Sequence, residues 1–163
     1  MREIKIEKVV LNVGCGGELE KIERAKKMLE MLTGKKPVVT KSKKRSTFGI
    51  AKGKPVGVKV TLRKKDAEEF LKKVFEAKKN TISSSQIDKN GNFSIGFSEY
   101  FELPGVKYNH EIGTLGFDVA VSLERAGYRV KKRKIKRSHI GESHKITKND
   151  TINWLKERGI NVL

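Results

Sequence analysis

Residues 31–65 contain twelve basic side chains and no acidic one, and residues 129–137 contain seven basic side chains and no acidic one. Together the two segments carry +19, whereas the net charge of the 163-residue chain is +18, so the other residues sum to −1. Like charges at this concentration repel one another and need a counter-charge. The sequence therefore predicts a near-neutral body with two basic segments.

Nucleic acid supplies such a counter-charge, because neutralising its phosphates releases condensed counterions. A solvated lysine-rich face and a nonspecific basic DNA- or RNA-compacting protein are the alternatives. The length fits one domain, and 36% apolar residues allow a modest core. No apolar run approaches the ~20 residues that cross a bilayer, and the one cysteine, Cys15, excludes an internal disulfide. We expect a cytoplasmic protein with no membrane partner.

Two segments have strand patterns. Residues 3–14 become apolar through Val9, Leu11 and Val13 and end in a glycine-rich turn. Residues 57–63 alternate strictly, with Val58, Val60 and Leu62 on one side and Lys59, Thr61 and Arg63 on the other. Shorter strands are expected at 37–40, 93–97, 100–103 and 117–124. One face of the second strand is therefore packed and its other face is basic.

Helical periods separate these strands. Apolar residues recur every three or four positions over 18–33, as Leu19, Ile22, Ala25, Leu29 and Leu32, and Gly34 is a natural C-cap. Asp66 and Glu69 have the spacing of a capping box that opens a second helix, and a third is expected from Thr147, with Asp150 as an alternative N-cap, to about Arg158. The fold class is α+β, a mainly antiparallel sheet with helices packed on one face, a basic loop and a C-terminal helical extension.

The sequence offers no enzyme site. The turn Gly14-Cys15-Gly16-Gly17 lies where a dinucleotide fingerprint would, but Leu19 replaces its third glycine. His139 and His144 flank Glu142 among basic residues that would repel a dication, so a structural role or RNA contact is favoured over metal binding. We expect a protein that is not an enzyme, with no cofactor and no metal. A nucleotide-dependent RNA-modifying enzyme would need the missing fingerprint.

The residues favour RNA as the partner. Lys59, Thr61 and Arg63 on one strand face suit a nucleic-acid backbone, and Asn12 is a polar exception in an apolar strand, although a structural asparagine fits equally well. Residues 41–57 form a loop longer than most. Its start, residues 42–49, mixes charge, hydroxyls and Phe48, which suits phosphate contact and base stacking in folded RNA.

Several segments, in this order, resemble the large-subunit ribosomal protein five family, the 5S-rRNA-binding proteins of the central protuberance. They are Val9-Val10-Leu11-Asn12-Val13-Gly14, Leu32-Thr33-Gly34-Lys35-Lys36-Pro37-Val38-Val39-Thr40-Lys41, Phe48-Gly49-Ile50, Gly53-Lys54-Pro55-Val56-Gly57-Val58-Lys59-Val60-Thr61-Leu62-Arg63, Asp88-Lys89-Asn90-Gly91-Asn92-Phe93-Ser94-Ile95-Gly96 and Leu103-Pro104-Gly105. The chain begins directly at the first strand and adds the basic segment 129–137 and a terminal helix, so it is similar to archaeal or eukaryotic members. Frequent Lys, Glu and Ile with a single Gln hint at a thermophile.

The resemblance implies a set of site residues. An asparagine in the first strand, a polar residue in the TG-x-KP turn and a threonine in the VTLR strand contribute to 5S rRNA binding in the family, and they match Asn12, Lys35 and Thr61. Bacterial members commonly have Gln at the position of Lys35. Because this chain has a lysine instead, a contact with phosphate is favoured there over an amide hydrogen bond. The loop 42–56 matches the segment that approaches the peptidyl-site (P-site) tRNA.

The predicted function is a structural constituent of the large ribosomal subunit that binds 5S rRNA in the central protuberance and contacts P-site tRNA. Residues 1–128 are the expected RNA-binding α+β domain, and residues 129–163 the basic tract and C-terminal helix. The expected partners are 5S rRNA, large-subunit rRNA, P-site tRNA and neighbouring ribosomal proteins. The predicted rRNA-binding residues are Asn12, Lys35, Thr40, Lys41, Lys59, Thr61 and Arg63. The predicted loop contacts are Lys43, Lys44, Arg45, Phe48, Lys52 and Lys54. The predicted auxiliary phosphate contacts are Arg129, Lys131, Lys132, Arg133, Lys134, Lys136 and Arg137.

Overall fold

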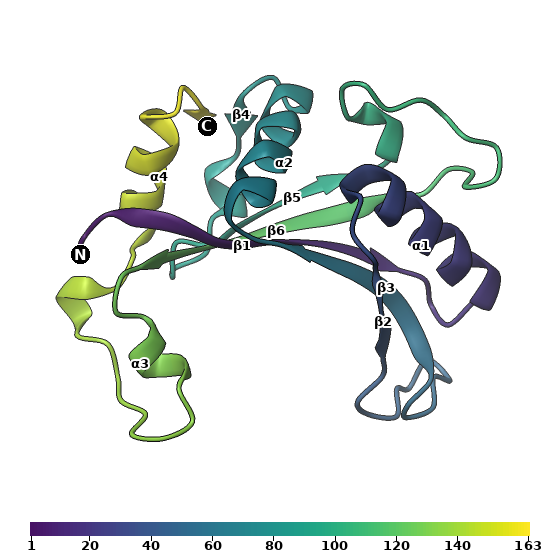
Figure 1. The fold of residues 1–163 in the computed structure, drawn as a ribbon, viewed down its shortest axis with the longest axis horizontal. Helices are drawn as coiled ribbons and strands as arrows, with labels where there is room; N and C mark the ends of the chain where they lie inside the picture. Colours follow the sequence, from purple (N-terminus) through teal and green to yellow (C-terminus); the bar gives the residue numbers. More distant parts are fainter. The chain divides into compact units, whose positions relative to one another are not determined.

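The computed structural model describes residues 1–163 and has an α+β fold (Figure 1). The strands are β1 (Ile4–Gly14), β2 (Val38–Lys41), β3 (Pro55–Leu62), β4 (Thr81–Ile82), β5 (Phe93–Phe97), β6 (Phe117–Arg125) and β7 (Asn161–Val162). The α-helices are α1 (Leu19–Thr33), α2 (Lys64–Ala77), α3 (Arg129–Lys132) and α4 (Lys148–Lys156). Short 3-10 turns lie at Ser84–Gln86, Tyr100–Glu102 and Glu142–His144.

Five strands form one sheet in the order β2-β3-β1-β6-β5, and β4 pairs with β7 in parallel as a separate two-stranded sheet. The β2–β3 pair is antiparallel, with Val38 opposite Lys59 and Thr40 opposite Gly57, and its register shifts between Thr40 and Lys41. The predicted α+β class is confirmed.

The chain divides into two compact units. Unit 1 contains residues 1–9, 63–95 and 120–163, and unit 2 contains residues 10–62 and 96–119. Both units combine segments that are distant in sequence. The division into an RNA-binding domain over 1–128 and an extension over 129–163 concerns function, and it stays a prediction.

In unit 2, the alternation of residues 57–63 has the predicted consequence. Val58, Val60 and Leu62 are buried and Lys59 and Thr61 are exposed. Helix α1 packs on β3 and ends at Gly34, whose backbone is left-handed and whose N–H donates to the Glu30 carbonyl. The predicted stripe of α1 was wrong at its first position, because Leu19 is 69% exposed. Met28, which was not part of the predicted stripe, is buried.

In unit 1, α2 begins earlier than predicted. Its N-cap is Arg63, with extended backbone, and no side chain caps it, so the predicted Asp66 capping box was wrong. The buried face of α2 carries Phe75, whose ring stacks on Phe93 of β5. Helix α4 begins where predicted, because the Thr147 hydroxyl and the Asp150 carboxylate each accept a backbone N–H of the other residue.

One predicted strand is wrong, and two segments for which no element was predicted contain short ones. Residues 100–103 form a 3-10 turn rather than a strand, because Glu99 and Glu102 cap it reciprocally and the Tyr100 hydroxyl accepts from the Asn109 N–H. The turn-rich stretch 80–92 contains β4 and a 3-10 turn. The basic segment 129–137 begins with the short helix α3.

Candidate nucleic-acid interface

One face of the sheet in unit 2 carries the polar side chains that the sequence singled out. On β1, Leu11 and Val13 are buried while Asn12 between them is exposed. On β3, Lys59 and Thr61 are exposed, and Thr40 of β2 lies half-buried opposite Gly57 on the same side. The structure thus brings Asn12, Thr40, Lys59 and Thr61 to one face, which we call the open face.

Gly57 keeps the strands of the open face close together. A Cβ atom at this position would lie 2.5 Å from the Val13 carbonyl oxygen and 3.1 Å from Thr40 Oγ1. No side chain fits at the first distance, so a glycine is needed where β3 lies against β1 and opposite Thr40.

The other three predicted rRNA-binding residues lie differently. Lys35 is exposed in the turn that follows Gly34, and Lys41 is exposed at the end of β2, where the register shifts. Arg63 belongs to unit 1, and its Nη1 donates to the Glu7 carbonyl oxygen at 3.4 Å.

The basic loop, residues 42–54, continues the β2–β3 hairpin. The Ser42 N–H donates to the Lys54 carbonyl, the Gly53 N–H to the Ser42 carbonyl, and the Ser46 N–H to the Ile50 carbonyl. The Ser46 hydroxyl also accepts from the Phe48 N–H. The shape of this loop therefore depends mainly on backbone hydrogen bonds.

The basic loop presents its cations without internal partners. Lys43, Lys44, Arg45, Lys52 and Lys54 are all exposed, and none of them forms an ion pair. Phe48, in the same loop, is 89% exposed. A solvated aromatic ring beside uncompensated cations is suited to stacking on a base while the cations contact phosphates.

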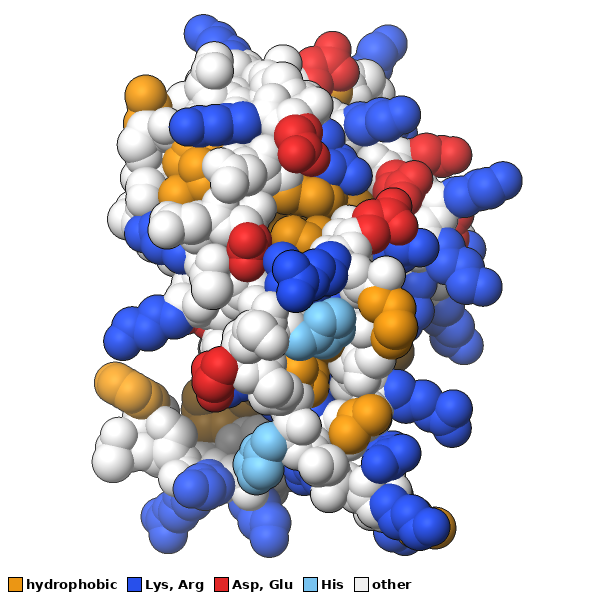
Figure 2. Space-filling view, turned by 90° about the vertical axis from the view of Figure 1, so that its left-hand side faces the viewer, with side chains coloured by type: hydrophobic (Ala, Val, Ile, Leu, Met, Phe, Trp, Pro, Cys, Tyr) orange, Lys and Arg blue, Asp and Glu red, His pale blue; other side chains and the backbone are white.

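The basic tract, residues 129–137, lies in unit 1 and is exposed except for the half-buried Val130. The view in Figure 2 shows basic side chains predominating in its lower part. Lys132 differs from its neighbours, because its Nζ lies 2.7 Å from a carboxylate oxygen of Glu7 and 3.1 Å from one of Glu124. That ammonium group holds α3 to β1 and β6 and is less available to phosphate than the other bases of the tract.

The pKa values of this ion pair move apart. Burial alone raises the pKa of Glu7, but the hydrogen bond and charge of Lys132, with the charges of Lys8 and Arg63, outweigh burial and lower it. Burial alone lowers the pKa of Lys132, and the hydrogen bonds and charges of Glu7 and Glu124 raise it. Both groups are therefore ionised across the neutral range.

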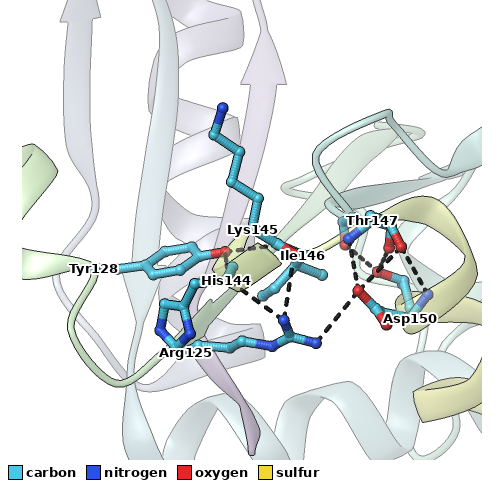
Figure 3. A network of polar contacts seen from close by, with 9 residues as sticks. Arg125, Tyr128, His144, Lys145, Ile146, Thr147 and Asp150 are labelled. Carbon is cyan, nitrogen blue, oxygen red and sulfur yellow. Dashed lines mark hydrogen bonds and ion pairs between the residues drawn. The ribbon is translucent and has the colours of Figure 1, made fainter. Parts of the chain in front are cut away.

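A polar network, which the sequence did not predict, lies next to the tract (Figure 3). The Arg125 guanidinium donates to the carbonyls of His144 and Lys145 at 3.4 and 3.3 Å and pairs with Asp150 at 3.3 Å. The Tyr128 hydroxyl accepts from the Ile146 N–H at 2.8 Å and donates to the His144 carbonyl at 3.3 Å. We call Arg125, Tyr128, His144 and Asp150 the anchoring network.

Two further observations complete the anchoring network. His144 Nε2 donates to the Ala126 carbonyl at 2.8 Å, which gives this histidine the structural role favoured by the sequence. The pKa of Asp150 is lowered, chiefly by the Thr147 backbone N–H, and further by the Thr147 hydroxyl and the Arg125 charge. No short motif announces this network, since its members are up to 25 residues apart and belong to ordinary residue types.

One hollow, about 280 Å³, lies beside the basic tract and is lined in part by Arg129 and Lys132. Another hollow, about 750 Å³, also lies in unit 1, and none of the predicted site residues lines it. No group of three or more His, Cys, Asp or Glu side chains could hold a metal ion, and no helix has the length and apolar character to span a membrane. Burial raises the pKa of the Cys15 thiol, which packs as a small core side chain.

Comparison with known families gives two matches that together extend over most of the chain. Residues 55–154 match the model of the C-terminus of the ribosomal L5 family, and residues 1–50 match the model of ribosomal protein L5. The two matches cover β1 to β2 with part of the basic loop, and then β3 to most of α4.

Archaeal relatives match over nearly the full length. The large ribosomal subunit protein uL5 of Sulfolobus acidocaldarius is 45% identical, with 96% of this chain and 89% of the relative covered. The protein of the same name from Picrophilus torridus is 48% identical, with 96% and 90% covered. That from Nanoarchaeum equitans is 45% identical, with 100% and 98% covered.

Proposed function

Because the chain belongs to the ribosomal protein L5 family, we propose that its open face binds 5S rRNA in the large ribosomal subunit and that its basic loop contacts P-site tRNA. As a member of this family, the chain is a structural constituent of the large subunit of the cytoplasmic ribosome, with rRNA and other ribosomal proteins around it. It is not an enzyme.

The observation that carries the 5S rRNA proposal is the clustering of Asn12, Lys59 and Thr61 as exposed side chains on one sheet face. An amide, an ammonium and a hydroxyl at fixed strand spacing supply donors and an acceptor for phosphates, 2′-hydroxyls and base edges. Lys35 adds charge in the turn before β2, and Lys41 adds charge at the end of β2. Charge then supplies affinity, while Asn12 and Thr61 supply selectivity.

Substitution of Asn12 and Thr61 tests this proposal. Asn12→Ala and Thr61→Val each remove hydrogen-bonding groups from an exposed position, so folding should be unchanged and affinity for 5S rRNA should fall by about tenfold. Thr114→Val, another exposed threonine of unit 2, is the control. Filter-binding titration gives the dissociation constants, and wild-type affinity in both variants would remove the open face from the 5S rRNA site.

A competition experiment separates this proposal from a nonspecific DNA- or RNA-compacting protein. The protein should prefer 5S rRNA over duplex DNA by at least about a hundredfold at the same salt concentration, because selective contacts add to phosphate binding. Equal competition by duplex DNA would favour the compacting protein. The family membership already argues against that alternative.

The exposed ring of Phe48 supports the tRNA contact. Stacking of one base on an aromatic side chain contributes about 1–3 kcal/mol, so Phe48→Ala should weaken P-site tRNA binding by about 5- to 150-fold in reconstituted large subunits. Thr47→Ala is the neighbouring control, because it leaves the ring and the charges of the basic loop in place. Unchanged tRNA dissociation in the Phe48 variant would place the loop against another partner.

A further inference from the structure

We propose that residues 129–143 form a second RNA-binding surface that contacts phosphate backbone without reading sequence, and that the anchoring network holds this loop in its binding shape. The proposal goes beyond the 5S rRNA site, because it concerns unit 1 and sequence-independent binding. It rests on the exposure of the tract, on its missing counter-charges, and on the hydrogen bonds that close the loop.

Most cations of the basic tract have no acidic partner. Arg129, Lys131, Lys134, Lys136 and Arg137 are exposed and form no ion pair. The nearby acids are already used, since Glu7 and Glu124 pair with Lys132 and Glu142 pairs with Lys145. Residues 129–143 therefore present an uncompensated positive charge.

Hydrogen bonds among residues 129–138 fix the shape of the tip of this segment. The Arg133 N–H donates to the Arg129 carbonyl, and the Ser138 N–H donates to the Val130 carbonyl at 3.2 Å, which brings the returning chain beside α3. Between these points, Arg133 Nε donates to the Lys136 carbonyl at 2.6 Å. The tip is thus a closed turn rather than an extended tail.

Hydrogen bonds also join the two ends of the segment 129–143 at its base. Tyr128 and Arg125 precede the tract, and both bond the backbone of residues 144–146 that follow it. The His144 ring bonds back to the Ala126 carbonyl and packs edge-on against the Tyr128 ring at 5.9 Å. Figure 3 shows these side chains converging from the two segments of chain that enter and leave the loop.

These constraints matter for affinity. A loop that is already closed at its base and its tip loses less conformational entropy when its cations meet phosphates than a free tail does. The side chains of the anchoring network do not themselves contact RNA. They are positioning residues.

The chemistry of the loop fits RNA better than an acidic protein segment. Protein interfaces usually have an apolar, well-packed centre, whereas the only large apolar side chain exposed in the tract is Ile135, at 77%. Separate cations on a closed turn match the spaced charges of a phosphate backbone. A ribosomal protein is also surrounded by such backbones.

The charge is tested by the salt dependence of binding to an RNA duplex of about 20 base pairs that lacks 5S sequence. Combined replacement of Arg129, Lys131, Lys134 and Arg137 by Gln should flatten the log–log slope by up to about 3–4 units. Combined replacement of Lys73, Lys89, Lys107 and Lys156 by Gln removes the same charge from scattered exposed sites and should change the slope by less than about one unit. An equal slope change in both variants would overturn the second surface.

The anchoring is tested without changing charge. Tyr128→Phe removes the hydroxyl that joins His144 and Ile146, so duplex affinity should fall about three- to tenfold while the salt slope stays at the wild-type value. Tyr108→Phe, a half-exposed tyrosine of unit 2, is the control. If Tyr128→Phe lowers the unfolding midpoint strongly, His144→Ala takes its place. Wild-type duplex affinity in a folded variant would refute the positioning role.

Two further measurements separate this second surface from the 5S rRNA site and from a site for an acidic protein. The Asn12→Ala and Thr61→Val variants should bind the duplex as the wild type does, so loss of the 5S rRNA site leaves this surface measurable. Polyglutamate of matched charge should compete poorly with the duplex. Equal competition by polyglutamate would reassign the tract to an acidic protein partner and overturn the RNA assignment.

Discussion

The basic loop and the basic tract both carry several cations and no acid, but they are held in different ways. The loop 42–54 continues the β2–β3 hairpin, and backbone hydrogen bonds close it. The tract 129–137 follows β6, and the side chains of Arg125, Tyr128, His144 and Lys132 fasten it. A loop closed by backbone bonds tolerates side-chain changes, whereas a loop closed by side chains depends on their identity. Stability should therefore respond to substitution differently in the two places.

The largest effect is expected at Arg125. Arg125→Met leaves two carbonyls and the Asp150 carboxylate without their cation, so the free energy of unfolding should fall by about 3 kcal/mol. Arg45→Met in the basic loop is the matched control and should change it by less than about 0.5 kcal/mol. Urea unfolding measures both. Equal losses would break the contrast between the two segments.

Gly57 tests the base of the basic loop. The added methyl group of Gly57→Ala would meet the Val13 carbonyl oxygen, so the free energy of unfolding should fall by about 2 kcal/mol as β3 shifts away from β1. Gly14→Ala is the control, since a Cβ atom there meets nothing within 4 Å. Because β3 carries Lys59 and Thr61, 5S rRNA affinity should fall as well. A fully stable Gly57 variant would show that the strands separate easily.

Thr147 tests the end of the anchoring network. Thr147→Ala removes the hydroxyl that accepts from the Asp150 N–H and donates to its carboxylate, which should cost about 1 kcal/mol of stability. The pKa of Asp150, followed by NMR, should rise but stay below its ordinary value, because the Thr147 backbone N–H, the chief cause of the lowering, remains. Thr47→Ala in the basic loop should have no measurable effect on stability.

The smallest effect is a dependence of stability on acid pH. The pKa values of Glu7 and Asp150 are lowered in the folded protein, so both contribute stability above their ordinary values of 4.5 and 3.8. That contribution is lost as the pH falls through the lower folded values. Glu7→Gln should remove about 0.5 kcal/mol at neutral pH, because Lys132 is half-exposed, and should flatten the acid side of the stability curve. An unchanged curve would mean that the Glu7–Lys132 pair does not stabilise α3.

Local patterns in the sequence were sufficient for much of the fold. The alternation over 57–63 identified the buried and exposed sides of β3, and Gly34 and Thr147 identified the end of α1 and the start of α4. These features depend on residues at most about four positions apart, so backbone geometry decides them. The strand predicted over 100–103 failed because the distant Asn109 and the reciprocal caps favour a turn.

The sequence by itself determined that the chain has two uncompensated basic segments, a strand with a polar exposed face, and motifs of a ribosomal family. Only the tertiary structure decided which bases are free. Lys132 is 125 residues from Glu7 in the chain, yet their charged groups lie 2.7 Å apart, while Lys131 beside it forms no ion pair. Charge is a property of residues, but its compensation depends on long-range packing, and that packing separates the cations that form ion pairs within the fold from those that remain unpaired.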